Sequence, residues 1–241
     1  MIKYATLTNK GNREVNEDSI GVESHNDMNC FVLCDGLGGH GMGDIASSLV
    51  RDVFVDQFSK TDDPVKFLGK TFMIAQDFLL AEQIERRSRN KMKTTCVALV
   101  TDDMTARIGH VGDSRLYIFR RNKVKRRTLD HSIPQMLVLA HEIKESEIRN
   151  HPERSTVMRS MGVEWETPQF ELMEPIPLRK CQAFLLCSDG FWELIDEKQM
   201  CELLKRCASP EEWLSEMENI VKANGIDRNM DNYSAIAVWN T

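Results

Sequence analysis

The chain has 241 residues, 41% of them hydrophobic and 28% charged, which are the values of a globular protein and exclude a disordered one. The formal net charge of −6 gives no overall positive field that could hold nucleic acid or an anionic membrane. Apolar runs such as 136–140 and 183–187 are far too short to span a bilayer, and no apolar signal segment opens the sequence. The seven cysteines form no CxxC pair, and several lie in apolar runs, as reduced core thiols do. We therefore expect a cytoplasmic protein without nucleic-acid or membrane partners.

Strands followed by a pair of helices are predicted for the first half of the chain. Residues 2–8 alternate between apolar and polar side chains, and the apolar run 31–34 is a second short strand. From residue 44 the spacing becomes helical, and Pro64 stands where the first turn of a second helix is expected. The apolar stripes of these two helices are Ile45, Leu49, Val53 and Phe58, then Val65, Leu68, Phe72, Ala75 and Leu79.

The second half of the chain repeats this order. Strands are predicted over 94–100, 106–111, 116–119 and 124–128, with a hairpin turn at 121–123, helical fragments over 131–166 and a buried strand over 184–187. Two helices with capping boxes follow, one at Asp196 and Gln199 and one at Ser209 and Glu212, before a last strand over 233–239. Paired helices between groups of strands indicate an α+β protein and not a regular βαβ fold. No linker or repeat divides the sequence, so we expect a single domain over 1–241.

Four aspartates from distant segments lie next to predicted strand ends: Asp18, Asp35, Asp189 and Asp231. Any one of them alone reads best as a turn former or helix cap. Together they point to a site, because loops at strand ends present functional groups, and converging carboxylates repel unless cations lie between them. Carboxylates without histidine or thiolate partners select Mg²⁺ or Mn²⁺ over zinc. Two such ions would hold a bridging hydroxide and activate it against phosphorus.

Arg13 is the complementary candidate. It lies five residues before Asp18, and its planar guanidinium can grip two phosphate oxygens, which lysine does less well. The residues alone therefore favour phosphate-ester hydrolysis.

Seven segments resemble the metal-dependent protein phosphatase 2C (PP2C) family of serine/threonine phosphatases, in the family's order. Residues Arg13–Asp18 resemble its RxxNEDx opening, and Asp35–His40 resemble its DGxGGH segment in the bacterial form. The other matching blocks are Gly112–Arg115, Leu129–Ser132, Arg159–Gly162, Ser188–Gly190 and Asp231–Ser234. The resemblance runs from Arg13 to Val238, and seven ordered blocks carry far more weight than one.

The resemblance implies a role for each matching residue. Asp35 would bridge two Mn²⁺ or Mg²⁺ ions, with the Gly36 carbonyl and Glu17 or Asp18, through water, completing one coordination shell. Asp189 and Asp231 would complete the other shell. Asp113, with Asp189, would hold a weaker third ion, and Arg13 would bind the substrate phosphate.

The resemblance also implies a fold and a reaction. The expected fold is a four-layer α-β-β-α sandwich of two mainly antiparallel sheets flanked by helix pairs, with a flap subdomain at about 132–166. The expected reaction is hydrolysis of phosphoserine and phosphothreonine in proteins, reversing a cognate serine/threonine kinase in a bacterial cytoplasm. We expect the protein to act as a monomer.

The chain departs from the eukaryotic family pattern at one position. Leu37 stands where those relatives carry a histidine general acid directly after the Asp-Gly pair. His40 lies three residues later in a glycine-rich loop, and we expect it to fix the loop and not to inherit the role. A water on the third ion is then the proton donor we expect.

Several alternatives stay open on the sequence alone. The GxGxxG pattern at 36–41 is a poor dinucleotide loop, because Asp35 would place negative charge beside the pyrophosphate and no βαβ unit follows. The spacing of His40, His131 and His151 matches no zinc pattern. The basic segment 120–127 is expected to be a solvated hairpin, with docking of acidic phosphopeptides as the alternative. A pseudophosphatase that binds phosphoprotein without turnover, or a hydrolase of small phosphomonoesters, would use the same site.

Overall fold

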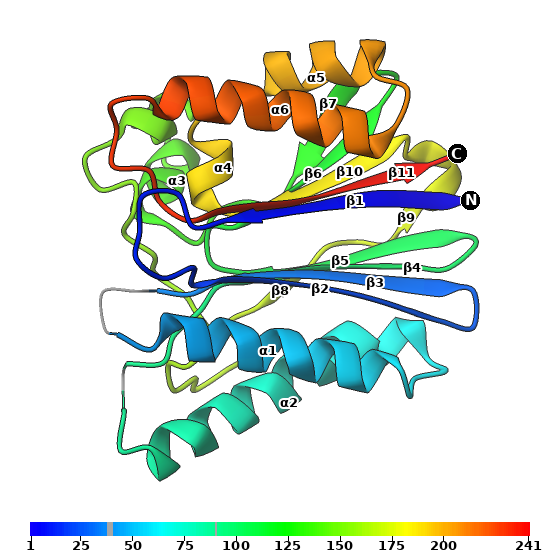
Figure 1. Cartoon of the computed structure of the whole chain (residues 1–241). Helices are drawn as coiled ribbons and strands as arrows, with labels where there is room; N and C mark the ends of the chain where they lie inside the picture. The colour runs from blue at the N-terminus through cyan, green and yellow to red at the C-terminus, as the bar shows by residue number, and fades with distance from the viewer. Residues whose placement is uncertain (38–40, 90) are drawn as a thin grey trace.

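The computed structural model describes residues 1–37, 41–89 and 91–241. Two β-sheets lie face to face, and a helix pair covers the outer side of each (Figure 1). The helices α1 (Gly43–Phe58) and α2 (Pro64–Glu85) cover one sheet, while α5 (Glu197–Arg206) and α6 (Pro210–Gly225) cover the other. The expected α-β-β-α sandwich is confirmed.

Every strand pairing in the two sheets is antiparallel. The first sheet has the order β1 (Ile2–Asn9), β11 (Tyr233–Asn240), β10 (Ala183–Cys187), β6 (Arg115–Arg120) and β7 (Lys123–Arg127). The second has the order β2 (Asp18–His25), β3 (Met28–Asp35), β4 (Cys96–Thr101), β5 (Thr105–Val111) and β8 (Glu171–Leu172), with β9 (Ile176–Pro177) also paired to β5. The core between the sheets is aliphatic and aromatic, and includes Phe31, Leu33, Leu99, Leu116, Phe184 and Ile236. The two-residue strands β8 and β9 were not predicted, because so short a segment has no measurable periodicity.

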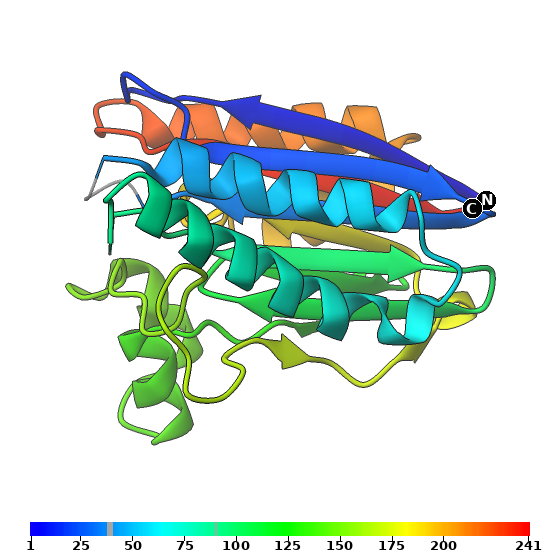
Figure 2. The ribbon, with the colours of Figure 1, turned by 90° about the horizontal axis from the view of Figure 1, so that it is seen from below.

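In the apolar stripe predicted for α1, Phe58 is buried as expected, but the other buried residues lie one row away from the prediction. The residues buried against the sheet are Ala46, Val50, Phe54 and Phe58, whereas Ile45, Leu49 and Val53 are only half-buried. The helix lies beside α2 as well as on the sheet, so its apolar arc is wider than one stripe (Figure 2). In α2 the predicted core residue Val65 is 68% exposed, because Phe67 and Leu68 occupy the core-facing side of the helix start.

Local sequence signals account for several element boundaries. Arg121 and Asn122 have φ values of +52° and +53°, which is the geometry of a tight turn between β6 and β7. Asp196 and Gln199 form the predicted reciprocal capping box at α5. At α6 Ser209 caps as predicted, but the Glu212 carboxylate accepts from the Ala208 N–H and not from that of Ser209.

The segment after β7 is helical only in its first half; the helical fragments predicted over 131–166 do not extend into 151–166, which contains no helix. It contains α3 (Ile133–Leu139) and the 3₁₀ helix η2 (Glu145–Asn150), and it projects from the edge of the sandwich (Figure 2). Another 3₁₀ helix, η3 (Leu178–Lys180), precedes β10, and the short helix α4 (Asp189–Trp192) follows it. Among the described helices, none combines the length and the apolar character needed to cross a membrane.

Candidate active site

A cavity of about 490 Å³ lies at the end of the sandwich opposite the chain termini. Its wall is acidic and includes Glu17, Asp35, Asp113, Asp189 and Asp231, together with Arg13, Gly36, Leu37 and Ser155. Of the residues that the sequence singled out as ligands, only Asp18 is not on the wall. Segments more than 200 residues apart in the chain therefore meet at one place, as the set of strand-end aspartates predicted.

The antiparallel register explains why these carboxylates converge. Asp18 opens β2 and Asp35 ends β3, and the two are direct partners at the open end of that hairpin. In the other sheet β10 pairs with β11, so Asp189, just after β10, and Asp231, just before β11, lie at the same end. Asp113 comes two residues after the end of β5.

A close backbone contact brings Glu17 to the wall. The Gly36 N–H donates to the Glu17 carbonyl at 3.1 Å. A Cβ at Gly36 would lie 2.4 Å from the Gly43 carbonyl oxygen, so only glycine allows α1 to begin this close to the end of β3.

The carboxylates destabilise one another's charged forms. Burial, followed by the charge of Asp18 and then of Asp189, raises the pKa of Asp35 well above its usual range. Burial and the nearby Asp113 do the same to the pKa of Asp189. Burial raises the pKa of Asp18 to about 7, although hydrogen bonds from serine hydroxyls act to lower it. The pKa of Asp113 is also raised to about 7, mainly by burial and then by the charge of Asp130. Without a cation, these carboxyl groups therefore tend to be protonated. A bound divalent cation would stabilise their charged forms and relieve the repulsion between them.

Asp18 provides a second indication that the site suits a divalent cation. Its Oδ2 accepts from the Ser188 hydroxyl at 2.8 Å, but its buried Oδ1 has no hydrogen-bond partner within the described parts of the chain. An unpaired buried carboxylate oxygen is costly unless a cation or a water is bound nearby. The oxygen-only donors of the pocket match the preference of Mg²⁺ and Mn²⁺.

Arg13 lies on the pocket wall with its guanidinium against Asp231. Its Nε donates to Oδ1 at 2.9 Å and its Nη2 donates to Oδ2 at 2.8 Å. This bidentate geometry is also the one that grips a phosphate. The pair is about half exposed, so the guanidinium is accessible at the pocket mouth.

The glycine-rich segment after β3 contributes Gly36 and Leu37 to the pocket wall. His40, with its expected role in fixing the loop, lies outside the described residues. No histidine is present among the described residues of the wall.

The sequence did not predict the contribution of Ser155 and Val157 to the pocket wall. Both belong to the segment proposed as a flap, and they stand between η2 and β8 without any regular element of their own. The family resemblance implied that the segment 132–166 is a flap beside the active site, but it singled out neither residue.

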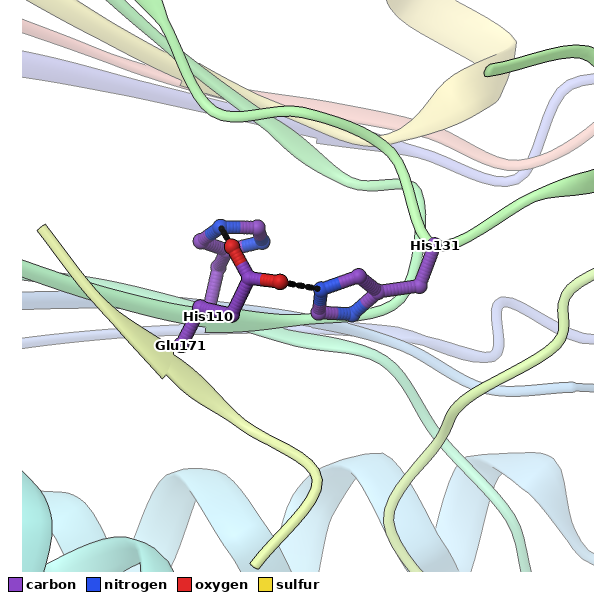
Figure 3. Close-up of side chains that lie close together, drawn as sticks. All are labelled: His110, His131 and Glu171. Carbon is purple, nitrogen blue, oxygen red and sulfur yellow. Dashed lines mark ion pairs between the residues drawn. The ribbon is translucent and has the colours of Figure 1, made fainter. Parts of the chain in front are cut away.

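Within the described residues, His131 lies with His110 and Glu171 and not with His151. His131 is stacked on His110, with ring centroids 4.8 Å apart, and the carboxylate of Glu171 faces both rings (Figure 3). His151 is not part of this group, which is the one potential histidine-containing metal cluster within the described residues. The Gly112 N–H donates to Nδ1 of His131, so Nε2 of the neutral ring carries a proton and is not free to bind a metal. Sequence spacing gave no signal for His110 and Glu171, which come from separate strands.

The basic hairpin is less solvated than expected. Arg127 is 9% exposed at its side chain and pairs with Asp130 and Glu145. It therefore ties β7 to the segment around η2, and is not free to dock a partner. The prediction of a fully solvated basic face was wrong for this residue because its acidic partners lie in the adjoining loop and in η2.

The comparisons with known proteins agree with this architecture. A sequence model of the protein phosphatase 2C family matches residues 8–232. The serine/threonine phosphatase stp of Listeria monocytogenes serotype 4b (strain F2365) is 30% identical over 200 residues, which cover 80% of this chain and 79% of that protein. The crystal structure of the serine/threonine phosphatase Stp1 of Staphylococcus aureus superposes with a TM-score of 0.92 at 26% identity, covering 100% of this chain and 96% of that one. The catalytic domain of the phosphatase PstP, solved in complex with two manganese ions, has the same fold, with a TM-score of 0.81 at 23% identity over 99% of this chain and 97% of that one. The chain is a member of the protein phosphatase 2C family.

Proposed function

We propose that this protein is a Mn²⁺- or Mg²⁺-dependent phosphatase that hydrolyses phosphoserine and phosphothreonine in proteins. The observation that carries the proposal is the convergence of six acidic side chains and one arginine on a single pocket. Membership of the protein phosphatase 2C family and the similarity to serine/threonine phosphatases support the same reaction.

The acidic wall divides into three proposed binding roles. Asp35, whose charged form is destabilised by several neighbouring carboxylates, would bridge two cations. The Gly36 carbonyl and Glu17 or Asp18 would help to bind the first cation. Asp189 and Asp231 would serve the second. Asp113, which raises the pKa of Asp189, would share a weaker third cation with it. Bound divalent cations would supply an activated water as nucleophile and neutralise the charge that develops on phosphorus.

Arg13 is proposed to orient the substrate. Its two N–H groups bond to one carboxylate in this structure, and the same pair of donors fits two oxygens of a phosphoryl group. Because Leu37 and not an acid follows Gly36, we propose that a water near Asp113 and Asp189 protonates the departing serine or threonine oxygen. Asp113 and Asp189 would hold that water in place.

The wider biological role rests on more indirect support. Ser155 and Val157 on the pocket wall support a flap at about 132–166 within a single domain of 1–241 that contacts the phosphorylated protein. The expected substrate is a protein phosphorylated by a cognate serine/threonine kinase, and the expected working form is a monomer. Seven cysteines without a disulfide support a reducing, cytoplasmic setting.

Phosphate release after removal of metal tests the proposal. Protein dialysed against a chelator is assayed with a phosphothreonine peptide and with p-nitrophenyl phosphate, before and after Mn²⁺ is restored. We expect no turnover without metal and turnover of both substrates with Mn²⁺. Full activity without bound metal would contradict the mechanism. Phosphopeptide binding without turnover would identify a pseudophosphatase, and turnover of p-nitrophenyl phosphate alone would identify a hydrolase of small phosphomonoesters.

A further inference from the structure

The turn that carries Asp113 into the pocket depends on an unusual backbone conformation. Gly112 follows β5 with a φ of +102°, and a Cβ at this position would lie 2.6 Å from the side chain of Thr95. Only glycine fits this conformation and this space. The carbonyl of Asp113 is fixed on the other side, where it accepts from Trp192 Nε1 at 3.1 Å.

His131 bonds to both main-chain polar groups of Gly112, its N–H and its carbonyl. The main-chain N–H of His131 donates to the Gly112 carbonyl at 2.9 Å. The Gly112 N–H in turn donates to Nδ1 of the His131 ring at 3.1 Å. The ring is buried, so water does not compete well for these bonds.

The second bond requires one tautomer of the ring. Nδ1 accepts a hydrogen bond only if it carries no proton, and the neutral ring then has its proton on Nε2. Nε2 lies 3.2 Å from Glu171 Oε1 without a hydrogen bond among the described residues, so it is the nearby negative charge that favours a proton on Nε2 (Figure 3). Stacking on His110, at an interplanar angle of 17°, fixes the plane of the ring. Burial lowers the pKa of His131, which also favours the neutral form.

We propose that His131 is a positioning residue of the active site, which holds Gly112 in the turn that presents Asp113 to the pocket, with Glu171 selecting the ring tautomer that this needs. The inference rests on the proposed function, because it assigns to Asp113 a role in binding a cation. His131 itself touches neither the substrate nor the proposed cations. Its effect reaches the pocket through one peptide unit.

The tautomer can be measured on the unmodified, metal-free protein. Long-range ¹⁵N–¹H correlation spectra distinguish a protonated from an unprotonated ring nitrogen, and amide hydrogen exchange reports the Gly112 N–H. We expect His131 to carry its proton on Nε2, and the Gly112 amide to be protected. A proton on Nδ1, or a Gly112 amide that exchanges as fast as those of exposed loops, would overturn the proposal whatever the enzyme does. Addition of Zn²⁺ that shifts the ring nitrogens of His110 and His131 together would likewise overturn it, because these residues would then form a metal site.

Two substitutions at position 131 separate positioning from packing. His131→Asn keeps an acceptor close to the place of Nδ1, whereas His131→Ala removes it. Supporting groups of this kind change metal affinity or activity by about 10–100-fold, so we expect His131→Ala to raise the half-activating Mn²⁺ concentration and to lower the Mn²⁺ stoichiometry found by calorimetry. We expect His131→Asn to keep a half-activating Mn²⁺ concentration and a Mn²⁺ stoichiometry close to those of the wild type. The control His25→Asn, at the end of β2 away from Asp18, should do the same.

The outcomes separate this proposal from the proposed function. Equal Mn²⁺ dependence of His131→Ala and the wild type would overturn the positioning role while leaving the phosphatase assignment intact. Equal losses in His131→Asn and His131→Ala, with Gly112 exchange unchanged, would show that only ring packing matters. Absence of Mn²⁺-dependent turnover in the wild type would instead contradict the proposed function, and the tautomer and exchange results would still decide the role of His131.

Discussion

Arg13 and Asp231 share a bidentate ion pair at the mouth of the pocket, with Nε–Oδ1 and Nη2–Oδ2 distances of 2.9 and 2.8 Å. The sequence had assigned these two residues to different partners, a phosphate and a cation. A cation bound to the same carboxylate would repel the guanidinium and compete with its two hydrogen bonds. The ion pair therefore links cation binding to phosphate binding, because a cation at Asp231 would release the Arg13 guanidinium to bind phosphate.

Replacing Arg13 with alanine should affect the substrate and not the cations. A charge-assisted hydrogen bond contributes about 1.5–3 kcal/mol, so we expect kcat/KM for a phosphothreonine peptide to fall at least about 10-fold. Arg13→Lys, which keeps the charge without the fork, should recover only part of the loss. Mn²⁺ affinity, measured by calorimetry, should not weaken, since Asp231 loses a competing partner. A collapse of Mn²⁺ affinity, or an unchanged kcat/KM, would assign Arg13 to a structural role.

The stability of the metal-free protein should fall as pH rises. The pKa of Asp18 and that of Asp113 are each raised to about 7, from an ordinary value of 3.8. Between these limits the folded protein binds more protons than the unfolded chain, so the free energy of unfolding decreases with pH. Saturating Mn²⁺ should remove or reverse this slope, because cation binding displaces those protons. Urea unfolding at pH 5 and at pH 8, with chelator and with Mn²⁺, measures both slopes, and a metal-free protein more stable at pH 8 would contradict the account.

Much of the fold followed from local patterns in the sequence. The strands over 2–8, 31–34 and 184–187 and the helix starts at Asp196 and Ser209 were predictable because periodicity and caps are local properties. The register that places Asp18 opposite Asp35 was not, because pairing depends on contacts between segments. The four-layer arrangement came from the family resemblance, since the order of elements alone is compatible with several packings.

Asp113 should matter most when metal is scarce. It offers one carboxylate to a cation that must share Asp189, and such a site binds weakly. Asp113→Ala is therefore expected to leave the main pair of cations bound but to lower kcat, most clearly at low Mn²⁺. Turnover of a phosphoserine peptide over a Mn²⁺ titration checks this, with bound Mn²⁺ counted in parallel. Wild-type kcat at every Mn²⁺ concentration would exclude the role.

A buried ion pair beneath the site should be important for stability. The Arg115 guanidinium donates to both oxygens of Asp130, at 2.9 and 2.6 Å, and lies 3.4 Å from the centre of the Trp192 ring. Arg115→Met would leave a buried carboxylate with Arg127 as its remaining partner. Loss of one partner of a buried pair costs about 3–5 kcal/mol, to be measured as the change in the free energy of unfolding. Arg120→Met, at the exposed end of the same strand, is the control and should change stability by less than about 0.5 kcal/mol.

The supporting groups of the site were less predictable than its carboxylates. Asp35 and Asp189 could be identified because acidic residues at strand ends are visible in a sequence. The hydrogen bond from Gly112 to the His131 ring depends on the ring tautomer. The contact of His131 with Glu171 depends on the two-residue edge strand β8. These features arise only when the sheet edge is assembled, so no spacing rule reveals them.

Phosphate release by Asp35→Asn at saturating Mn²⁺ tests the central claim most directly. Asp35 lies at the centre of the acidic pocket, and its replacement removes the carboxylate proposed to bridge two cations while keeping its shape. Loss of several kcal/mol of metal-derived stabilisation predicts at least about a 100-fold fall in kcat for a phosphothreonine peptide. The variant should stay folded and be no less stable than the wild type without metal, because one crowded charge is gone. Turnover near the wild-type rate in a folded Asp35→Asn protein would contradict the account.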